Sequence, residues 1–121
     1  FRVIFFEGVN AVLSRLIVSN GRSSTFASNI RIRFASLVLN DSIVRDSSAS
    51  VGILLSFGTL TMNRTLIERN QGGGVTIQDG NALINQSTFR NNSASVSALR
   101  ISGSPGTLNI ANSTMFGNVS T

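Results

Sequence analysis

The sequence predicts an all-β protein wound into a parallel β-helix of about five coils, each of 22 to 27 residues. Short strand-like runs recur along all 121 residues, and they fall into two series that share one period. The composition agrees, since Ser, Thr, Asn and Gly are abundant while charged residues make up only 12%. That balance is typical of short strands joined by polar turns rather than of helices.

The first series places one large apolar residue in each coil, two residues after a small or aliphatic one. Its members are separated by 26, 23, 22 and 27 residues. Alternation of this kind is the period of a β-strand. We therefore expect one side chain per coil to stack in a common core, and the stack comprises Val18, Val44, Ile67, Phe89 and Phe116.

The second series consists of the runs "VIF", "IRI", "ILL", "VTI" and "LRI". Their last residues are Phe5, Ile32, Leu55, Ile77 and Ile101. A glycine follows most of them, as at Gly8, Gly58, Gly80 and Gly103, where we expect a turn with positive φ. A unit this short cannot bury its apolar face alone, so coils must stack with each strand parallel to its counterpart.

A column of Asn and Asp residues follows the first series by two or three positions. Both residue types tolerate the left-handed conformation at a bend and bond to nearby backbone. Stacked in successive coils, their amides can also form a hydrogen-bonded ladder. We interpret the column as structural rather than as a ligand site, and it comprises Asn20, Asp46, Asn70, Asn92 and Asn118.

Six Asn residues begin an Asn-x-Ser/Thr sequence, which is the acceptor for N-linked glycans on exposed loops. They are Asn40, Asn63, Asn85, Asn91, Asn112 and Asn118. The repeat itself accounts for most of them, which favours an architectural role over glycosylation. Four of them, Asn40, Asn63, Asn85 and Asn112, precede a member of the first series by an even number of residues. Strand alternation then predicts that these four point inward, where they must be hydrogen-bonded, unless a bulge reverses the alternation.

Three segments resemble a known family pattern: "GGGV" at Gly72 to Val75, "FRNN" at Phe89 to Asn92, and "NSTMFGN" at Asn112 to Asn118. They are similar to the repeats of polymorphic outer membrane proteins, within the wider pectate-lyase-like class of β-helices. The resemblance covers about half of the chain. It implies a right-handed β-helix on a secreted or cell-surface protein, often an adhesin, an autotransporter passenger or a surface fibre.

Residues suited to catalysis are sparse. The chain has no His and no Cys, and its acidic residues are Glu7, Asp41, Asp46, Glu68 and Asp79. These carboxylates stand at different positions within the coil, so we expect no facing catalytic pair and no catalytic, cofactor or metal site. Asp46 and Glu68 are one coil apart with Arg neighbours, which predicts ion pairs.

We therefore expect a non-enzymatic structural or adhesive β-solenoid, with a fibre or filament among its forms. The alternative is a polysaccharide-processing lyase or hydrolase whose catalytic residues lie outside this segment. A third reading is a carbohydrate-binding module that uses the Arg residues of one face. On the first reading, residues 1–121 form a single segment of a longer secreted or cell-surface solenoid.

The basic residues are all Arg and give a net charge of +5, which favours acidic partners such as acidic polysaccharide or a cell surface. The Arg residues are scattered, which argues against specific binding to nucleic acid. No apolar run is long enough to insert into a membrane. Unpaired strand edges at the ends of a coil stack predict self-association end to end, or contact with neighbouring solenoid segments.

Overall fold

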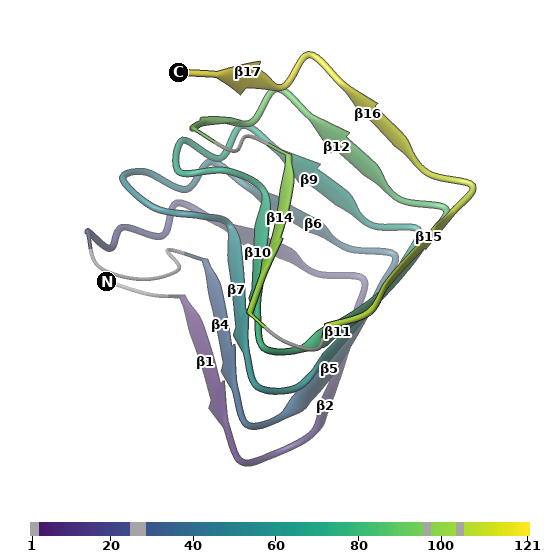
Figure 1. Ribbon diagram of the computed structural model, residues 1–121. Helices are drawn as coiled ribbons and strands as arrows, with labels where there is room; N and C mark the ends of the chain where they lie inside the picture. Colours follow the sequence, from purple (N-terminus) through teal and green to yellow (C-terminus); the bar gives the residue numbers. More distant parts are fainter. Residues whose placement is uncertain (1–2, 25–28, 96–97, 104–105) are drawn as a thin grey trace.

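The computed structural model describes residues 3–24, 29–95, 98–103 and 106–121. Within these residues every regular element is a β-strand, and the strands build three parallel sheets of five strands each (Figure 1). Each coil contributes one strand to every sheet, so neighbours in a sheet come from successive coils. The predicted all-β parallel β-helix of about five coils is confirmed, and right-handed winding is consistent with it.

The strands of each sheet follow one another at the coil period. The first sheet contains β1 (Ile4–Glu7), β4 (Ile30–Arg33), β7 (Ile53–Ser56), β10 (Val75–Gln78) and β14 (Leu99–Ser102). The second contains β2 (Ala11–Ser14), β5 (Ser36–Asn40), β8 (Thr59–Asn63), β11 (Asn81–Asn85) and β15 (Leu108–Ala111). The third contains β3 (Ile17–Ser19), β6 (Ile43–Arg45), β9 (Leu66–Glu68), β12 (Thr88–Arg90) and β16 (Thr114–Phe116). A short fourth pair joins β13 (Ser93–Ala94) to β17 (Val119–Ser120).

The core lies between the three sheets and is made of columns of aliphatic side chains. Parallel register places equivalent residues of successive coils side by side, for example Leu37 beside Leu60, and Leu39 beside Met62. All four of these side chains are fully buried. Because identical positions pack on one another through the coils, each coil buries its apolar face only against its neighbours.

Three corners join the three sheets, and each corner uses a residue with positive φ. The first corner holds Gly8, Phe34, Phe57, Asp79 and Gly103. The second holds Arg15, Asp41, Arg64, Gln86 and Asn112. The third holds Asn20, Asp46, Arg69, Asn91 and Gly117. A left-handed residue interrupts the two-residue alternation of a strand, so inward parity does not carry over from one sheet to the next.

The structure corrects one member of each apolar series. Phe89 pairs with Met115, whereas Phe116 pairs with Arg90 and is 50% exposed, so Phe116 is not part of the core stack. Likewise Phe6 rather than Phe5 pairs with Ile32. The side-chain period of a strand is two, so an error of one residue moves a side chain from the core to the surface. The remaining stack members Val18, Val44, Ile67 and Phe89 are buried.

The glycines after the first sheet divide into two kinds. Gly8 and Gly103 have positive φ, as expected for a turn. Gly58 and Gly80 lie one residue later and do not; the left-handed residues before them are Phe57 and Asp79. At Gly58 a Cβ would collide with the carbonyl oxygen of Ala35 in the preceding coil. Close approach between coils, not backbone conformation, is what requires glycine there.

We expect Gly58→Ala to lower the free energy of unfolding by about 2 kcal/mol or more, because backbone of the adjacent coil must move to admit the methyl group. Gly8→Ala is the matched control, since an added Cβ there meets nothing within 4 Å and φ is 68°. It should cost only about 1 kcal/mol for the left-handed conformation. Urea unfolding of both variants measures the difference, and equal losses would contradict the close-approach explanation.

Candidate functional site

Polar side chains inside the third corner form a continuous ladder between coils. Asn70 donates from Nδ2 to Oδ1 of Asn92 at 3.0 Å, and Asn92 donates in the same way to Asn118 at 2.9 Å. Each Oδ1 also accepts a backbone N–H from the coil below, as when Ser47 donates to Asn70 at 3.1 Å. Asn70 and Asn92 are fully buried, so these bonds satisfy groups that water cannot reach.

Two residues assigned to this ladder from the sequence lie outside it. Asn20 and Asp46 occupy the left-handed corner position, one residue before the ladder position, and Asp46 binds Arg69 at the surface. In their coils the ladder position is held by Gly21 and Ser47, as the register of the third sheet shows. Neither residue has a side-chain amide, so in the first two coils the amide of the ladder must come from a different position in the sequence.

Asn29 supplies the missing amide from the other side of the corner. Its Oδ1 accepts the Gly21 N–H at 2.8 Å, and its Nδ2 donates to Asn70 Oδ1 at 3.3 Å. Asn29 directly precedes β4, at the position that Gly52 occupies before β7. A Cβ at Gly52 would lie 2.9 Å from the Asn70 side chain. Four amides therefore line this corner, those of Asn29, Asn70, Asn92 and Asn118. The position facing Asn70 is the small residue Gly52.

The strand Asn residues of the glycosylation sequences point outward, which corrects the inward parity expected from the sequence. In β5 the inward residues are Leu37 and Leu39, so Asn40 faces the solvent side. Asn63 Nδ2 donates to Asn40 Oδ1 at 2.9 Å, and Asn85 occupies the same outward position in β11. The left-handed residue that follows each of them reverses the alternation.

Asn112 differs from the other strand Asn residues, because Ala111 and not Asn112 pairs with Asn85. Asn112 is the left-handed residue at the second corner of its coil, and its Nδ2 donates to Asn85 Oδ1 at 3.4 Å. Of the remaining two acceptors, Asn91 is exposed at the third corner and Asn118 ends the interior ladder. The amide of Asn118 therefore already has a structural use.

The hydroxyl residues of the same sequences are structural as well. Ser42, Thr65 and Ser87 are at most 2% exposed. The Ser87 hydroxyl donates to the carbonyl of Asn85 at 2.9 Å and accepts the N–H of Thr65, one coil below, at 3.1 Å. The Asn-x-Ser/Thr repeat thus encodes an outward amide, a left-handed corner residue and an inward hydroxyl that bonds to the neighbouring coil.

The outer face of the third sheet carries a cluster of ion pairs between coils. Glu68 is only 2% exposed and lies 2.7 Å from Arg90, 2.9 Å from Arg69 and 3.9 Å from Arg45. Arg69 also binds Asp46 at 2.8 Å. The ion pairs expected for Asp46 and Glu68 are present, but Glu68 is buried beneath its Arg partners rather than exposed.

A second ion pair between coils stands at the second corner. Arg64 binds Asp41 through two bonds of 2.6 and 2.9 Å. These hydrogen bonds hold the pKa of Asp41 below its ordinary value of 3.8, and the charges of Arg64 and Arg15 act in the same direction. Desolvation opposes the shift; its influence on the pKa is smaller than that of the hydrogen bonds and larger than that of either charge.

The lowered pKa of Asp41 predicts a pH-dependent contribution to stability. A carboxyl with a lower pKa in the folded than in the unfolded state stabilises the fold above the unfolded pKa, and this stabilisation disappears as pH falls through the folded pKa. We expect Asp41→Asn to lower the unfolding temperature slightly at neutral pH, with a difference that shrinks below pH 3.8. Thermal unfolding of both proteins across pH tests this, and a difference that grows in acid would contradict it.

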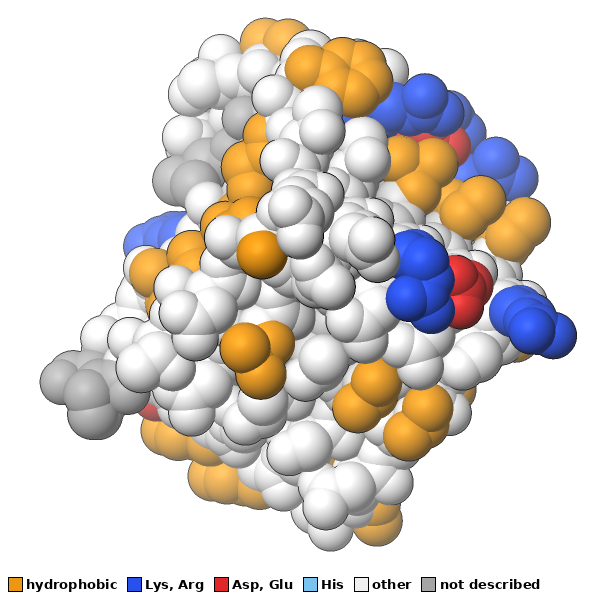
Figure 2. Space-filling view, turned by 90° about the vertical axis from the view of Figure 1, so that its right-hand side faces the viewer, with side chains coloured by type: hydrophobic (Ala, Val, Ile, Leu, Met, Phe, Trp, Pro, Cys, Tyr) orange, Lys and Arg blue, Asp and Glu red, His pale blue; other side chains and the backbone are white. Residues whose placement is uncertain are grey.

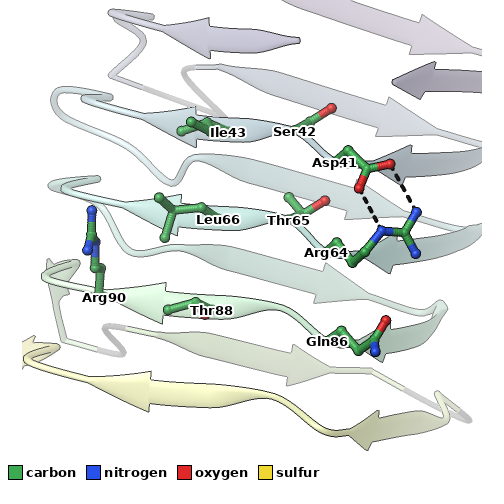
Figure 3. A pocket seen from close by; sticks show the side chains of 9 residues that line it. All are labelled: Asp41, Ser42, Ile43, Arg64, Thr65, Leu66, Gln86, Thr88 and Arg90. Carbon is green, nitrogen blue, oxygen red and sulfur yellow. Dashed lines mark hydrogen bonds and ion pairs between the residues drawn. The ribbon is translucent and has the colours of Figure 1, made fainter. Parts of the chain in front are cut away.

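Between these ion pairs lies a shallow trough of about 520 Å³ that crosses three coils (Figure 3). Ile43, Leu66 and Thr88 form a row along β6, β9 and β12, and Arg90 stands at one end of the third strand. The second-corner residues of the same three coils line the opposite side, namely Asp41, Arg64 and Gln86. Figure 2 shows basic and acidic side chains side by side on this part of the molecule, with hydrophobic side chains between them.

The trough offers guanidinium, amide and hydroxyl groups beside an aliphatic floor. That arrangement suits reversible binding of a ligand that bears carboxylates and hydroxyls. Within residues 3–24, 29–95, 98–103 and 106–121, no group of three or more His, Cys, Asp or Glu side chains could hold a metal ion. The same residues include no helix that is long and apolar enough to cross a membrane.

Comparison with known proteins gives no family for this chain. No family model, no curated protein and no solved structure matches it.

Proposed function

We propose that this chain is a non-enzymatic structural or adhesive segment of a secreted or cell-surface protein. The observation that carries the proposal is how its acidic groups are used. Four of the five carboxylates bind an Arg of the adjacent coil, and these pairs are Glu7 with Arg33, Asp41 with Arg64, Asp46 with Arg69, and Glu68 with Arg90. Carboxylates are the groups that general acid–base catalysis would need in this chain, and these four form ion pairs between coils instead.

The proposed mechanical role is that of a stiff rod. Every coil is joined to the next by three parallel strand pairs, and each coil adds about 4.8 Å of length. The interior Asn ladder strengthens the third corner, and ion pairs join the first four coils. Inward side chains of the end coils are partly open, with Leu16 at 40% and Met115 at 42% exposure. The proposal includes contact of these coils with neighbouring solenoid segments or with a second copy, as in a fibre.

The proposed adhesive surface is the trough on the third sheet, and its proposed ligand is an acidic polysaccharide of a cell surface. Five Arg residues stand on or beside this face against three acids, a local excess of two positive charges. The Arg residues are Arg15, Arg45, Arg64, Arg69 and Arg90, and the acids are Asp41, Asp46 and Glu68. Such an excess attracts polyanions and makes their binding sensitive to salt.

Binding of polygalacturonate and of alginate at several salt concentrations tests the adhesive surface. We expect Arg90→Ala and Arg64→Ala to weaken binding, and to reduce the slope of log affinity against log salt by about one for each lost contact. Arg100→Ala is the matched control, because Arg100 is exposed on the first sheet, away from the trough. Equal effects of all three substitutions would indicate attraction by net charge alone and would contradict a specific trough.

Cleavage of the same polysaccharides tests the non-enzymatic part. The proposal predicts that the protein releases no new chain ends or unsaturated products during long incubation. Cleavage that Asp41→Asn or Glu68→Gln abolishes, in a variant that remains folded, would overturn it in favour of a polysaccharide-processing enzyme.

A further inference from the structure

Asn20 and Gly21 form the one Asn-Gly pair in the sequence, and they lie at the third corner of the first coil. Asn20 has a φ of 61° and an exposed side chain, whereas Gly21 is buried. A glycine after Asn leaves the next backbone nitrogen unhindered, so that nitrogen can attack the side-chain amide. Asn-Gly pairs are for this reason the most prone to spontaneous deamidation.

The structure engages the two reacting groups separately. The Gly21 N–H donates to Asn29 Oδ1 at 2.8 Å in a buried hydrogen bond. The Asn20 side chain lies on the solvent side, where its Nδ2 donates to Ser19 Oγ at 3.1 Å. Before the Gly21 nitrogen can attack, it must lose both its proton and its bond to Asn29.

We propose that Asn20 is a deamidation site and that the Asn29 hydrogen bond sets its rate. The Gly21 nitrogen gives up its proton and forms a bond to Asn20 Cγ, while the Cγ–Nδ2 bond breaks. The departing nitrogen takes up a proton and leaves as ammonia, and a five-membered succinimide remains. One water molecule then opens the ring at either carbonyl and gives aspartate or isoaspartate. Nothing is oxidised or reduced, and the net change is one water consumed and one ammonia released.

The product adds a negative charge at a sensitive place. Asn20 and Asp46 are equivalent corner residues of adjacent coils, so the new carboxylate stands next to Asp46. Asp46 already binds Arg69, and its repulsion by a second carboxylate opposes stacking of the first coil on the second. Isoaspartate also lengthens the backbone by one atom at the corner. Deamidation therefore loosens the first coil, independently of the function proposed above.

Timed incubation at mildly alkaline pH, followed by peptide mapping that separates Asn, Asp and isoAsp, measures the rate at Asn20. We expect Asn29→Ser to raise that rate about tenfold, the factor that a hydrogen bond of about 1.4 kcal/mol represents. Asn92→Ser is the matched control: Asn92 is as buried as Asn29 and belongs to the same ladder, but its side chain bonds to Asn70, Ile67 and Asn118 instead of Gly21. The rate in Asn92→Ser should stay near that of the unchanged protein.

Two outcomes would overturn the proposal. Equal acceleration in Asn29→Ser and Asn92→Ser would show that general loosening of the fold controls the rate. If Asn29→Ser does not fold, the unchanged protein is compared with and without urea, and a native rate equal to the unfolded rate would show that Asn29 gives no protection. Asn20→Gln must abolish the new product, because any that persists comes from another residue.

Discussion

Asn70→Ala is expected to lower the free energy of unfolding by about 4 kcal/mol. The Asn70 side chain makes four hydrogen bonds in a buried site: Oδ1 accepts from Ser47 N–H and Asn29 Nδ2, and Nδ2 donates to Val44 O and Asn92 Oδ1. Truncation leaves several of these partners buried without a bond, at a cost of about 1 to 3 kcal/mol for each group. The losses are not additive, because neighbouring groups relax together.

Asn109→Ala is the control for this prediction. Asn109 also lies in a strand, β15, but its side chain is exposed. Its removal should change stability by no more than about 0.5 kcal/mol. Urea unfolding followed by far-ultraviolet circular dichroism compares the two variants. A loss below about 1 kcal/mol for Asn70→Ala would show that the interior ladder is not a principal source of stability.

Phe89→Ala is expected to be equally severe, at about 4 kcal/mol. Phe89 is fully buried between Ile67 and Met115 in the core stack, so its loss removes apolar burial and leaves a cavity between coils. A domain of ordinary stability has only about 5 to 15 kcal/mol in total, so this variant will be partly unfolded at modest temperature. The same urea titration measures the loss.

Phe116→Ala separates the observed register from the one expected from the sequence. Phe116 pairs with Arg90 and is 50% exposed, so its truncation should cost less than about 1 kcal/mol. If Phe116 belonged to the core stack, its removal would cost nearly as much as that of Phe89. A small effect of Phe116→Ala beside a large effect of Phe89→Ala would support the register described here.

The coil period could be predicted from the sequence because it repeats in many independent residues. Apolar triplets such as Ile53 to Leu55 and Val75 to Ile77 recur at the same spacing as the Asn-x-Ser/Thr sequences. Because many positions repeat, the coil period can still be recognised when the alignment of one coil is wrong by one residue. The all-β class, the parallel pairing and the number of coils all follow from the period alone.

Side-chain direction could not be predicted across the corners. Asp41, Arg64 and Gln86 adopt a left-handed conformation that could not be predicted from their residue types. Gln86 lies between Asn85 and Phe89 and reverses the inward–outward alternation there, so Asn85 faces outward rather than inward. Gln86 and Arg64 are poor left-handed residues in isolation, so the stack must impose the conformation.

The interior ladder shows a second limit of prediction from sequence. Asn70, Asn92 and Asn118 recur at the coil period, so their stacking could be expected. Asn29 breaks the period, because it reaches the same ladder from a position before β4. A contact between residues 41 positions apart leaves no local pattern. The one available signal is that Asn29 stands where later coils have Gly52 and Gly74.

The central claim is that the polar residues of each coil serve to join it to the next, and hydrogen exchange tests this most directly. The backbone N–H groups of Ser47, Asn70 and Asn92 lie outside the strands, yet each donates to an Asn side chain of the next coil at 3.1 Å. We predict that they exchange as slowly as core strand amides such as Leu39 and Ile67. Exchange at the rate of exposed corner amides would contradict the claim.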